Sequence, residues 1–272
     1  MEKEPMQIKI GNINCSLISA GSFWVDGGAA MGVLPKTIWR KFLKVDEKNR
    51  IELALNVLLL QTGKLNILVD TGIGNKISEK IRKIYQPSDF VLLQNLVNLG
   101  LNASDIDIVV LTHLHFDHCG GTTSIFNGKK VLTFPNALHI IQKREWETAK
   151  NPDELDKASY NFAEDLALLE TTGNYRLIDG NYALTKEITL ELTGGHSEGM
   201  QVVRIESNGK LAYYAGDIIP MDANRHLSVT SAFDLNRKQT FLAKKKILQE
   251  LKEKKGILFL NHDTENEIVV FQ

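Results

Sequence analysis

Cysteine is scarce in this chain, which excludes one common way of stabilising a fold. The sequence contains two cysteines, Cys15 and Cys119, so a disulfide framework is not expected to hold the protein together. We expect Cys119, next to His118, to be a small buried packing residue. Long apolar runs are also missing. Stretches such as residues 57–60 and 257–260 are far too short to span a bilayer, so no membrane partner is expected.

The chain also lacks a net charge of one sign. Its 32 Lys and Arg nearly cancel its 33 Asp and Glu, which leaves a formal net charge of −1. Nucleic acid backbones are held by a surplus of basic side chains, so no nucleic acid partner is expected. The first residues lack the charged-then-apolar layout of a signal peptide. We therefore expect a cytoplasmic protein.

No linker rich in proline, glycine and serine interrupts the sequence, and no internal repeat is present. We expect residues 1–272 to form one domain, with a large core because 43% of the residues are hydrophobic. Short apolar or alternating runs predict strands at residues 55–60, 65–69, 106–111, 138–141, 188–192, 201–205, 211–215 and 257–260.

Helical patterns lie between these strands. They predict helices at residues 90–99, after the helix-start signal Pro87-Ser88, and at residues 152–170 and 237–255. The lysines of the last helix are expected to form a solvated face. Strands interleaved with helices suggest two packed sheets with helices outside, although a doubly wound sheet would give the same pattern.

Three of the seven histidines fall within six residues, in the run His113-Leu-His115-Phe-Asp117-His118. The run follows an apolar strand, so its side chains should emerge at the carboxyl end of that strand. His113 and His115 lie two residues apart on an extended segment and can grip one cation from the same side. A turn after Phe116 would let Asp117 and His118 face a second cation. Imidazole with carboxylate suits zinc, and also manganese or iron.

Three more potential ligands follow predicted strands elsewhere in the chain. His196 lies in a glycine turn after residues 188–192, Asp217 follows residues 211–215, and His262 follows residues 257–260. Two histidines are left over. His139 lies inside a predicted strand, which favours a core histidine, and His226 has no assigned place.

With these residues in place, the sequence resembles the metallo-β-lactamase superfamily over residues 70–262. The resemblance implies an α/β fold, a four-layer αββα sandwich of two mixed sheets with the metals at one edge. It implies two Zn²⁺ per chain, with Mn²⁺ or Fe²⁺ as the other metals that such ligands bind. The ligands it implies are His113, His115 and His196 for one metal, Asp117, His118 and His262 for the other, and Asp217 as a bridge. Diiron members that reduce oxygen carry a Glu where this chain has His115, which favours zinc and hydrolysis.

Within the superfamily, residues 26–36 resemble a loop of quorum-quenching N-acyl homoserine lactonases, and methyl parathion hydrolases have a similar layout. The resemblance implies a hydrolase that opens a small-molecule lactone or ester with a metal-bridging hydroxide, with phosphotriester or phosphodiester hydrolysis as the alternative. Two departures affect the substrate. Pro220 stands where lactonases carry a Tyr that contacts the lactone carbonyl, and Ala30-Met31 stands where the loop usually reads Met-Phe.

The expected chemistry rests on two carboxylates. Two cations about 3.5–4 Å apart lower the pKa of a shared water, Asp217 orders both cations, and Asp117 is a candidate proton shuttle.

Several roles stay open at this point. Asp70 and Asp26 either support the site or cap glycine turns. Phe23, Trp24 and Met31 either line an acyl-chain pocket or belong to the core. The sequence leaves open whether the chain forms a homodimer.

Overall fold

The computed structural model describes residues 5–272 and contains two large sheets. The first has seven strands in the order β1-β2-β3-β4-β5-β8-β9. Its strands are β1 (Met6–Ile10), β2 (Ile13–Asp26), β3 (Arg50–Gln61), β4 (Asn66–Val69), β5 (Ile108–Val110), β8 (Leu138–Gln142) and β9 (Tyr175–Ile178). The neighbours from β4 to β9 are parallel, and those from β1 to β4 are antiparallel.

The second sheet has six strands in sequence order, and only its β13–β14 pair is parallel. Its strands are β10 (Tyr182–Ala183), β11 (Ile188–Leu192), β12 (Gln201–Ser207), β13 (Lys210–Tyr214), β14 (Ile257–Phe259) and β15 (Ile268–Val270). A separate hairpin joins β6 (Thr123–Phe126) to β7 (Lys129–Leu132).

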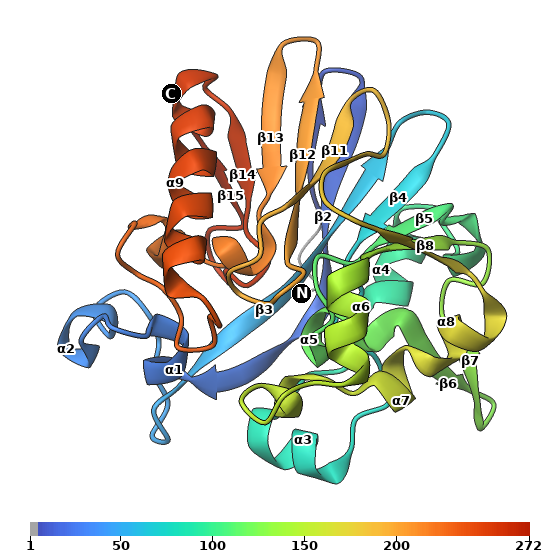
Figure 1. Ribbon diagram of the computed structural model, residues 1–272, viewed down its shortest axis with the longest axis horizontal. Helices are drawn as coiled ribbons and strands as arrows, with labels where there is room; N and C mark the ends of the chain where they lie inside the picture. The colour runs from blue at the N-terminus through green and yellow to red at the C-terminus, as the bar shows by residue number, and fades with distance from the viewer. Residues whose placement is uncertain (1–4) are drawn as a thin grey trace.

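The helices are mostly short and lie outside the two sheets (Figure 1). The α-helices are α1 (Gly27–Met31), α2 (Lys36–Trp39), α3 (Glu79–Tyr85), α4 (Leu92–Asn98), α5 (Phe116–Cys119), α6 (Lys143–Lys150), α7 (Phe162–Asp165), α8 (Ala167–Thr172) and α9 (Arg237–Glu253). The 3₁₀ turns are η1 (Ala103–Asp105), η2 (Gly120–Thr122), η3 (Lys157–Ser159), η4 (Gly216–Ile218) and η5 (Asp222–Arg225). Among residues 5–272, no helix is long and apolar enough to cross a membrane.

Three apolar clusters separate the layers. The central one lies between the sheets, where residues such as Leu58 and Val110 of the first sheet meet Val203 and Phe259 of the second. Another covers the opposite face of the first sheet beneath helices that include α4, α6 and α8, and the third packs α9 on the second sheet. This layering of helix, sheet, sheet and helix confirms the predicted αββα sandwich and excludes a single doubly wound sheet.

All eight strands predicted from the sequence are present, with ends that differ by a few residues. The largest difference is β3, which begins at Arg50 because its antiparallel pairing with β2 continues as far as Asp26. Strand β2 itself was not predicted. A bulge between Ser19 and Ser22 interrupts its pairing, and it therefore disturbs the period-two pattern that marks a strand.

The long helix predicted at residues 152–170 is wrong. The segment forms η3, α7 and α8, with non-helical residues between them. Tertiary contacts account for the breaks: the Tyr160 hydroxyl donates to Glu145, and buried Asp165 pairs with Lys76 at 3.1 Å. The helix predicted at residues 90–99 exists as α4, but Ser88 does not cap it. The Ser88 hydroxyl instead accepts the N–H of Ser22.

The helix predicted at residues 237–255 exists as α9, and most of its lysines are exposed or half-buried. Lys244 differs from the expected solvated face because it is buried and donates to the carbonyl oxygen of Val229. Burial lowers the pKa of Lys244 to about 8. One polar position of α9 therefore holds the loop that precedes the helix.

Candidate metal centre

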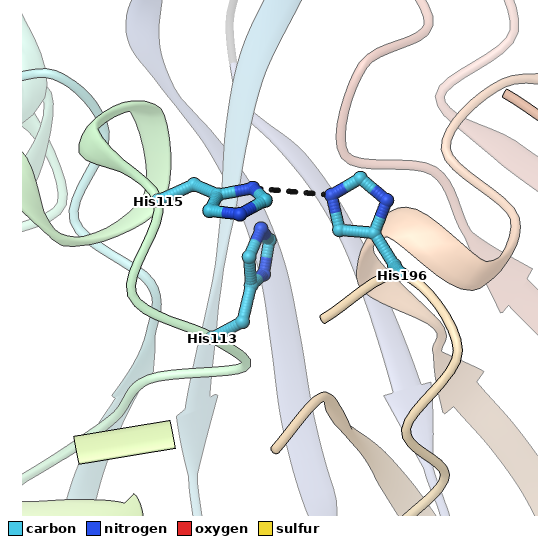
Figure 2. A group of neighbouring side chains, drawn as sticks. All are labelled: His113, His115 and His196. Carbon is cyan, nitrogen blue, oxygen red and sulfur yellow. Dashed lines mark hydrogen bonds between the residues drawn. The ribbon is translucent and has the colours of Figure 1, made fainter. Parts of the chain in front are cut away.

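The histidine-rich run lies where the sequence predicted, at the carboxyl end of a buried strand. Strand β5 pairs on both sides with parallel neighbours, so the chain leaves it at an edge of the sheet. The rings of His113 and His115 are 4.5 Å apart between centroids, and both face His196 (Figure 2). The chain then turns into α5, which places Asp117 and His118 beside His262.

Three loops of the second sheet complete the group. His196 follows β11, Asp217 lies in η4 after β13, and His262 follows β14. The turn before His196 requires glycine, because Gly195 has a φ of +95° and a Cβ there would lie 2.7 Å from the backbone nitrogen of Thr240. The structure thus brings together all seven residues that were singled out as ligands. It leaves His139 and His226 outside the group.

The spacing of the nitrogen atoms fits metal coordination. His115 Nδ1 and His196 Nε2 are 3.2 Å apart, as are His118 Nε2 and His262 Nε2. Two imidazoles bound tetrahedrally at 2.0–2.1 Å from zinc would place their nitrogens about 3.3–3.4 Å apart. The Nε2 atom of His113 is buried and has no hydrogen-bond partner among the described residues. Buried polar atoms are rarely left unpaired, so a cation is the partner this donor set fits.

Asp217 lies between two sets of nitrogens. Its Oδ1 atom is 3.2 Å from His118 Nε2 and 3.3 Å from His262 Nε2, while its Oδ2 atom is 3.2 Å from His196 Nε2. The Oδ2 atom of Asp117 is 3.5 Å from Nε2 of both His118 and His262. Each oxygen of Asp217 therefore faces a different set of potential ligands, which is the arrangement of a bridging carboxylate.

The charges in the group differ from residue to residue. Burial, reinforced by the neighbouring histidines, holds the pKa of His113 and His115 well below the usual value, so both imidazoles stay neutral. Burial would raise the pKa of Asp217, but the surrounding histidines, His118 first, outweigh it and hold that pKa well below its usual range. Burial would lower the pKa of His118 and His196, but the nearby carboxylates, Asp217 first, outweigh it and raise both pKa values, so a cation would displace a proton from each ring. Neutral imidazole and ionised carboxylate are the forms in which these side chains bind metals.

Asp70 supports His118. Its Oδ2 atom lies 2.9 Å from His118 Nδ1 and accepts the Tyr214 hydroxyl at 3.2 Å. Its Oδ1 atom accepts the backbone N–H of Thr112. A carboxylate on the far nitrogen of a ligand histidine fixes the ring and its tautomer. Of the two roles left open for Asp70, the structure therefore favours support of the site.

The rings of two other candidate ligands are held in the same way. Asp234 Oδ1 lies 3.0 Å from His196 Nδ1, and the carbonyl oxygen of Ala54 lies 2.7 Å from His262 Nδ1. Sequence reasoning missed Asp234, because only the path of the loop before α9 brings it to His196. Asp26 has a different role: it caps α1 by accepting the N–H of Ala29.

Glu145 of α6 is a second residue that the sequence did not reveal. Its carboxylate is buried, and Oε1 accepts the N–H of Leu114 at 3.0 Å and the Tyr160 hydroxyl at 3.1 Å. Oε2 accepts the Ser197 hydroxyl at 2.7 Å and the N–H of Gly199 at 2.8 Å. One side chain thus joins the segment between His113 and His115 to the loop that carries His196.

Aromatic side chains flank the group beside His262. Phe23 lies 5.7 Å from the His262 ring and 6.3 Å from Phe116, and Tyr85 packs on Phe116 at 5.2 Å. Met31 is completely buried, so it belongs to the core and not to the mouth of a pocket.

A cavity of about 800 Å³ borders His262. Its lining combines apolar side chains such as Trp24, Phe42 and Met221 with charged ones such as Asp222 and Arg225. It also includes His226, whose place the sequence left unassigned. Of the two neighbours in β2, Trp24 therefore lines the pocket, whereas Phe23 is buried in the core. Cys119 is buried, as expected, and His139 is a core residue of β8.

The chain is similar to known lactonases in sequence. It is 28% identical over 225 residues to an N-acyl homoserine lactonase from Bacillus thuringiensis, which covers 77% of this chain and 81% of the relative. An N-acyl homoserine lactonase from Bacillus cereus is also 28% identical, over 234 residues that cover 80% of this chain and 85% of the relative.

Many solved structures resemble this one. A probable metal-dependent hydrolase from Staphylococcus aureus has a TM-score of 0.91 and 30% identity, with 97% of this chain and 94% of that chain covered. AidC, described as a dizinc quorum-quenching lactonase in complex with a product, has a TM-score of 0.79 and 25% identity, with 98% and 92% covered. The family model of the metallo-beta-lactamase superfamily matches residues 51–262. The fold, the histidine-rich edge and this match agree, and the chain belongs to the metallo-β-lactamase superfamily.

Proposed function

We propose that this protein is a lactonase that uses two divalent cations, with zinc as the first choice and acyl homoserine lactones as the substrate class. The observation that carries the proposal is the arrangement around Asp217, whose two oxygens face separate sets of nitrogens. One cation would be held by His113, His115 and His196, and the other by Asp117, His118 and His262. The lactonase names of the relatives support the choice of substrate.

When bound, two such cations lower the pKa of a shared water and polarise a carbonyl oxygen. The chain's own residues supply the rest. Asp217 holds the two ligand sets at a fixed separation, and Asp70 and Asp234 fix the rings of His118 and His196. We assign to Asp117 the transfer of a proton from the attacking water to the oxygen that leaves as the ring opens. Its Oδ2 atom lies beside Nε2 of His118 and His262, which leaves Oδ1 for the proton, and the side chain is partly exposed.

The cavity beside His262 gives the acyl chain a place. Its walls include Trp24, Leu34 and Phe42, and apolar walls of this kind bury an acyl chain. Pro220 has no side-chain donor for the lactone carbonyl, and its own carbonyl oxygen accepts the N–H of His262. One lost neutral hydrogen bond is worth about 0.5–1.5 kcal/mol, or about tenfold in rate at most. We therefore expect modest lactonase activity.

A substrate panel tests this proposal. Metal-loaded protein is assayed with short- and long-chain acyl homoserine lactones, aryl esters and a paraoxon-like phosphotriester, and metal content is measured on the same sample. We expect two metals per chain and ring opening that chelation removes and added Zn²⁺ restores. One metal or fewer per loaded chain contradicts the dinuclear site. Triester hydrolysis without lactone hydrolysis at any chain length would instead support the phosphoester alternative.

A further inference from the structure

Asn261, the residue before His262, forms a hydrogen bond with the carboxylate between the two ligand sets. Its side-chain amide donates from Nδ2 to Asp217 Oδ1 at 2.7 Å. Asn261 is buried, and its backbone carbonyl oxygen accepts the backbone N–H of Asn56 in β3 at 2.9 Å. The backbone that carries this amide is therefore fixed against the first sheet, although Asn261 and Asp217 both lie in loops of the second.

The orientation of the amide follows from the chemistry of its partner. An ionised carboxylate only accepts hydrogen bonds, so the NH₂ group of Asn261 must face Asp217. Its own Oδ1 atom is left buried without a partner among the described residues. A buried amide oxygen without a partner is unfavourable, so local packing alone does not explain why the amide lies this way round.

The hydrogen bond reaches only one side of the bridge. Asp217 Oδ1 is the oxygen beside His118 and His262, whereas Oδ2 faces His196 and accepts no amide hydrogen bond in residues 5–272. The two oxygens therefore differ: one is held by a fixed donor, and the other is positioned only through the rest of the carboxylate.

We propose that Asn261 is a positioning residue that holds Asp217 Oδ1 toward the His118–His262 side and so makes the two cation positions unequal. The inference rests on the proposed dinuclear site. Without the amide, the carboxylate can rotate about its last bond, and the position that depends on Oδ1 loses a well-placed oxygen. Partners that hold ligand carboxylates typically change metal affinity by about 10–100-fold when removed.

Metal titration of metal-free protein tests the proposal without any turnover measurement. Wild type, Asn261→Ala and Asn261→Leu are titrated with Co²⁺, whose absorption reports each donor set, and Zn²⁺ affinities follow from competition with a chelator. We call the position held by Asp117, His118 and His262 the outer one, and the position held by the other three histidines the inner one. A His262→Ala variant identifies the absorption band of the outer position. Asn224→Ala is the matched control, because Asn224 is equally buried, has an unpaired Oδ1 and lies outside the candidate ligand groups.

We expect both Asn261 variants to bind the outer cation about 10–100-fold more weakly, with the inner position and the Asn224→Ala control unchanged. Equal weakening at both positions, or no weakening at either, overturns the positioning role. Asn261→Leu keeps most of the side-chain volume, so it carries the test if thermal unfolding shows that Asn261→Ala is not folded. Wild-type protein that takes up one metal or none would contradict the proposed function itself, an outcome distinct from a change confined to the variants.

Discussion

Asp234 Oδ1 lies 3.0 Å from Nδ1 of His196, on the side of the ring away from Asp217. Both side chains are buried, so water does not compete for this contact. The pair fixes which nitrogen of His196 faces the group. Because His196 is the only one of the three histidines in its set that comes from the second sheet, the orientation of its ring decides whether the three nitrogens can bind one cation together.

We predict that Asp234→Ala lowers metal affinity at the His196 position and lowers kcat, each by about 10–100-fold, because the ring loses the partner that orients it. Asp234→Asn should be milder, since an amide oxygen can still accept from Nδ1. The measurements are metal retention after dialysis and kcat in excess Zn²⁺. Wild-type retention in Asp234→Ala would show that the ring needs no such partner.

Asp217→Asn should impair the protein more than His262→Ala. The carboxylate faces both ligand sets, whereas His262 faces one, and an amide carries no charge to offset the cations. We expect Asp217→Asn to lose both metals and His262→Ala to lose one, as measured by elemental analysis alongside turnover. If Asp217→Asn keeps both metals and near-normal turnover while His262→Ala does not, Asp217 is not the bridge.

Glu145→Ala should destabilise the fold. The substitution leaves buried donors on Leu114, Ser197 and Gly199 without an acceptor. Each such group costs about 1–3 kcal/mol, so we expect a loss of several kcal/mol in the free energy of unfolding, measured in urea. Glu147→Ala on the same helix is the control, because Glu147 is exposed and makes only a long i,i+4 contact with Lys143. Similar losses in both variants would show that the effect belongs to the helix.

His139 should make the protein less stable as the pH falls from about 6.5 to about 4. Burial lowers the pKa of His139 to about 4, so in this range the unfolded chain binds a proton that the folded one does not, and the free energy of unfolding decreases with falling pH. The full effect is roughly 3 kcal/mol, since one pKa unit is worth about 1.4 kcal/mol.

The measurement compares His139→Leu with wild type in urea at several pH values. At pH 7 the two should be close, because the carbonyl of Asn174 still accepts the backbone N–H of residue 139. At pH 4–5 the variant should be the more stable one. A constant difference across the range would show that His139 does not titrate between these limits.

The grouping of the candidate ligands could be predicted from the sequence because each lies within a few residues of the end of an apolar strand. His196, Asp217 and His262 lie in different loops, yet the carboxyl ends of their strands meet at one edge, and local pattern was enough. The supporting residues could not be found in that way. Asp234, Glu145 and Asn261 act through contacts that only the folded chain creates, and no local signal distinguishes them from ordinary polar residues.

Some features of the fold were available in the sequence and were missed. The β6–β7 hairpin turns at Asn127-Gly128, whose φ angles are +50° and +74°, and Asn-Gly between short strands is a strong hairpin signal. The helix predicted at residues 152–170 failed for a different reason. Its amphipathic pattern is real, but the buried ion pair of Asp165 with Lys76 overrides it.

The hydrogen bonds from β3 to the loop of His262 carry a consequence for the whole chain. The backbone N–H groups of Ala54 and Asn56 in the first sheet donate to the backbone carbonyls of residues 262 and 261, which lie between β14 and β15 of the second sheet. The ligand pairs span the same boundary: His115 and His196 are 81 residues apart, and His118 and His262 are 144 apart. Each proposed cation is therefore a cross-link that closes a long loop of chain, and closing long loops removes much freedom from the unfolded state. The metals would then stabilise the packing of the two halves of the sandwich in addition to taking part in catalysis.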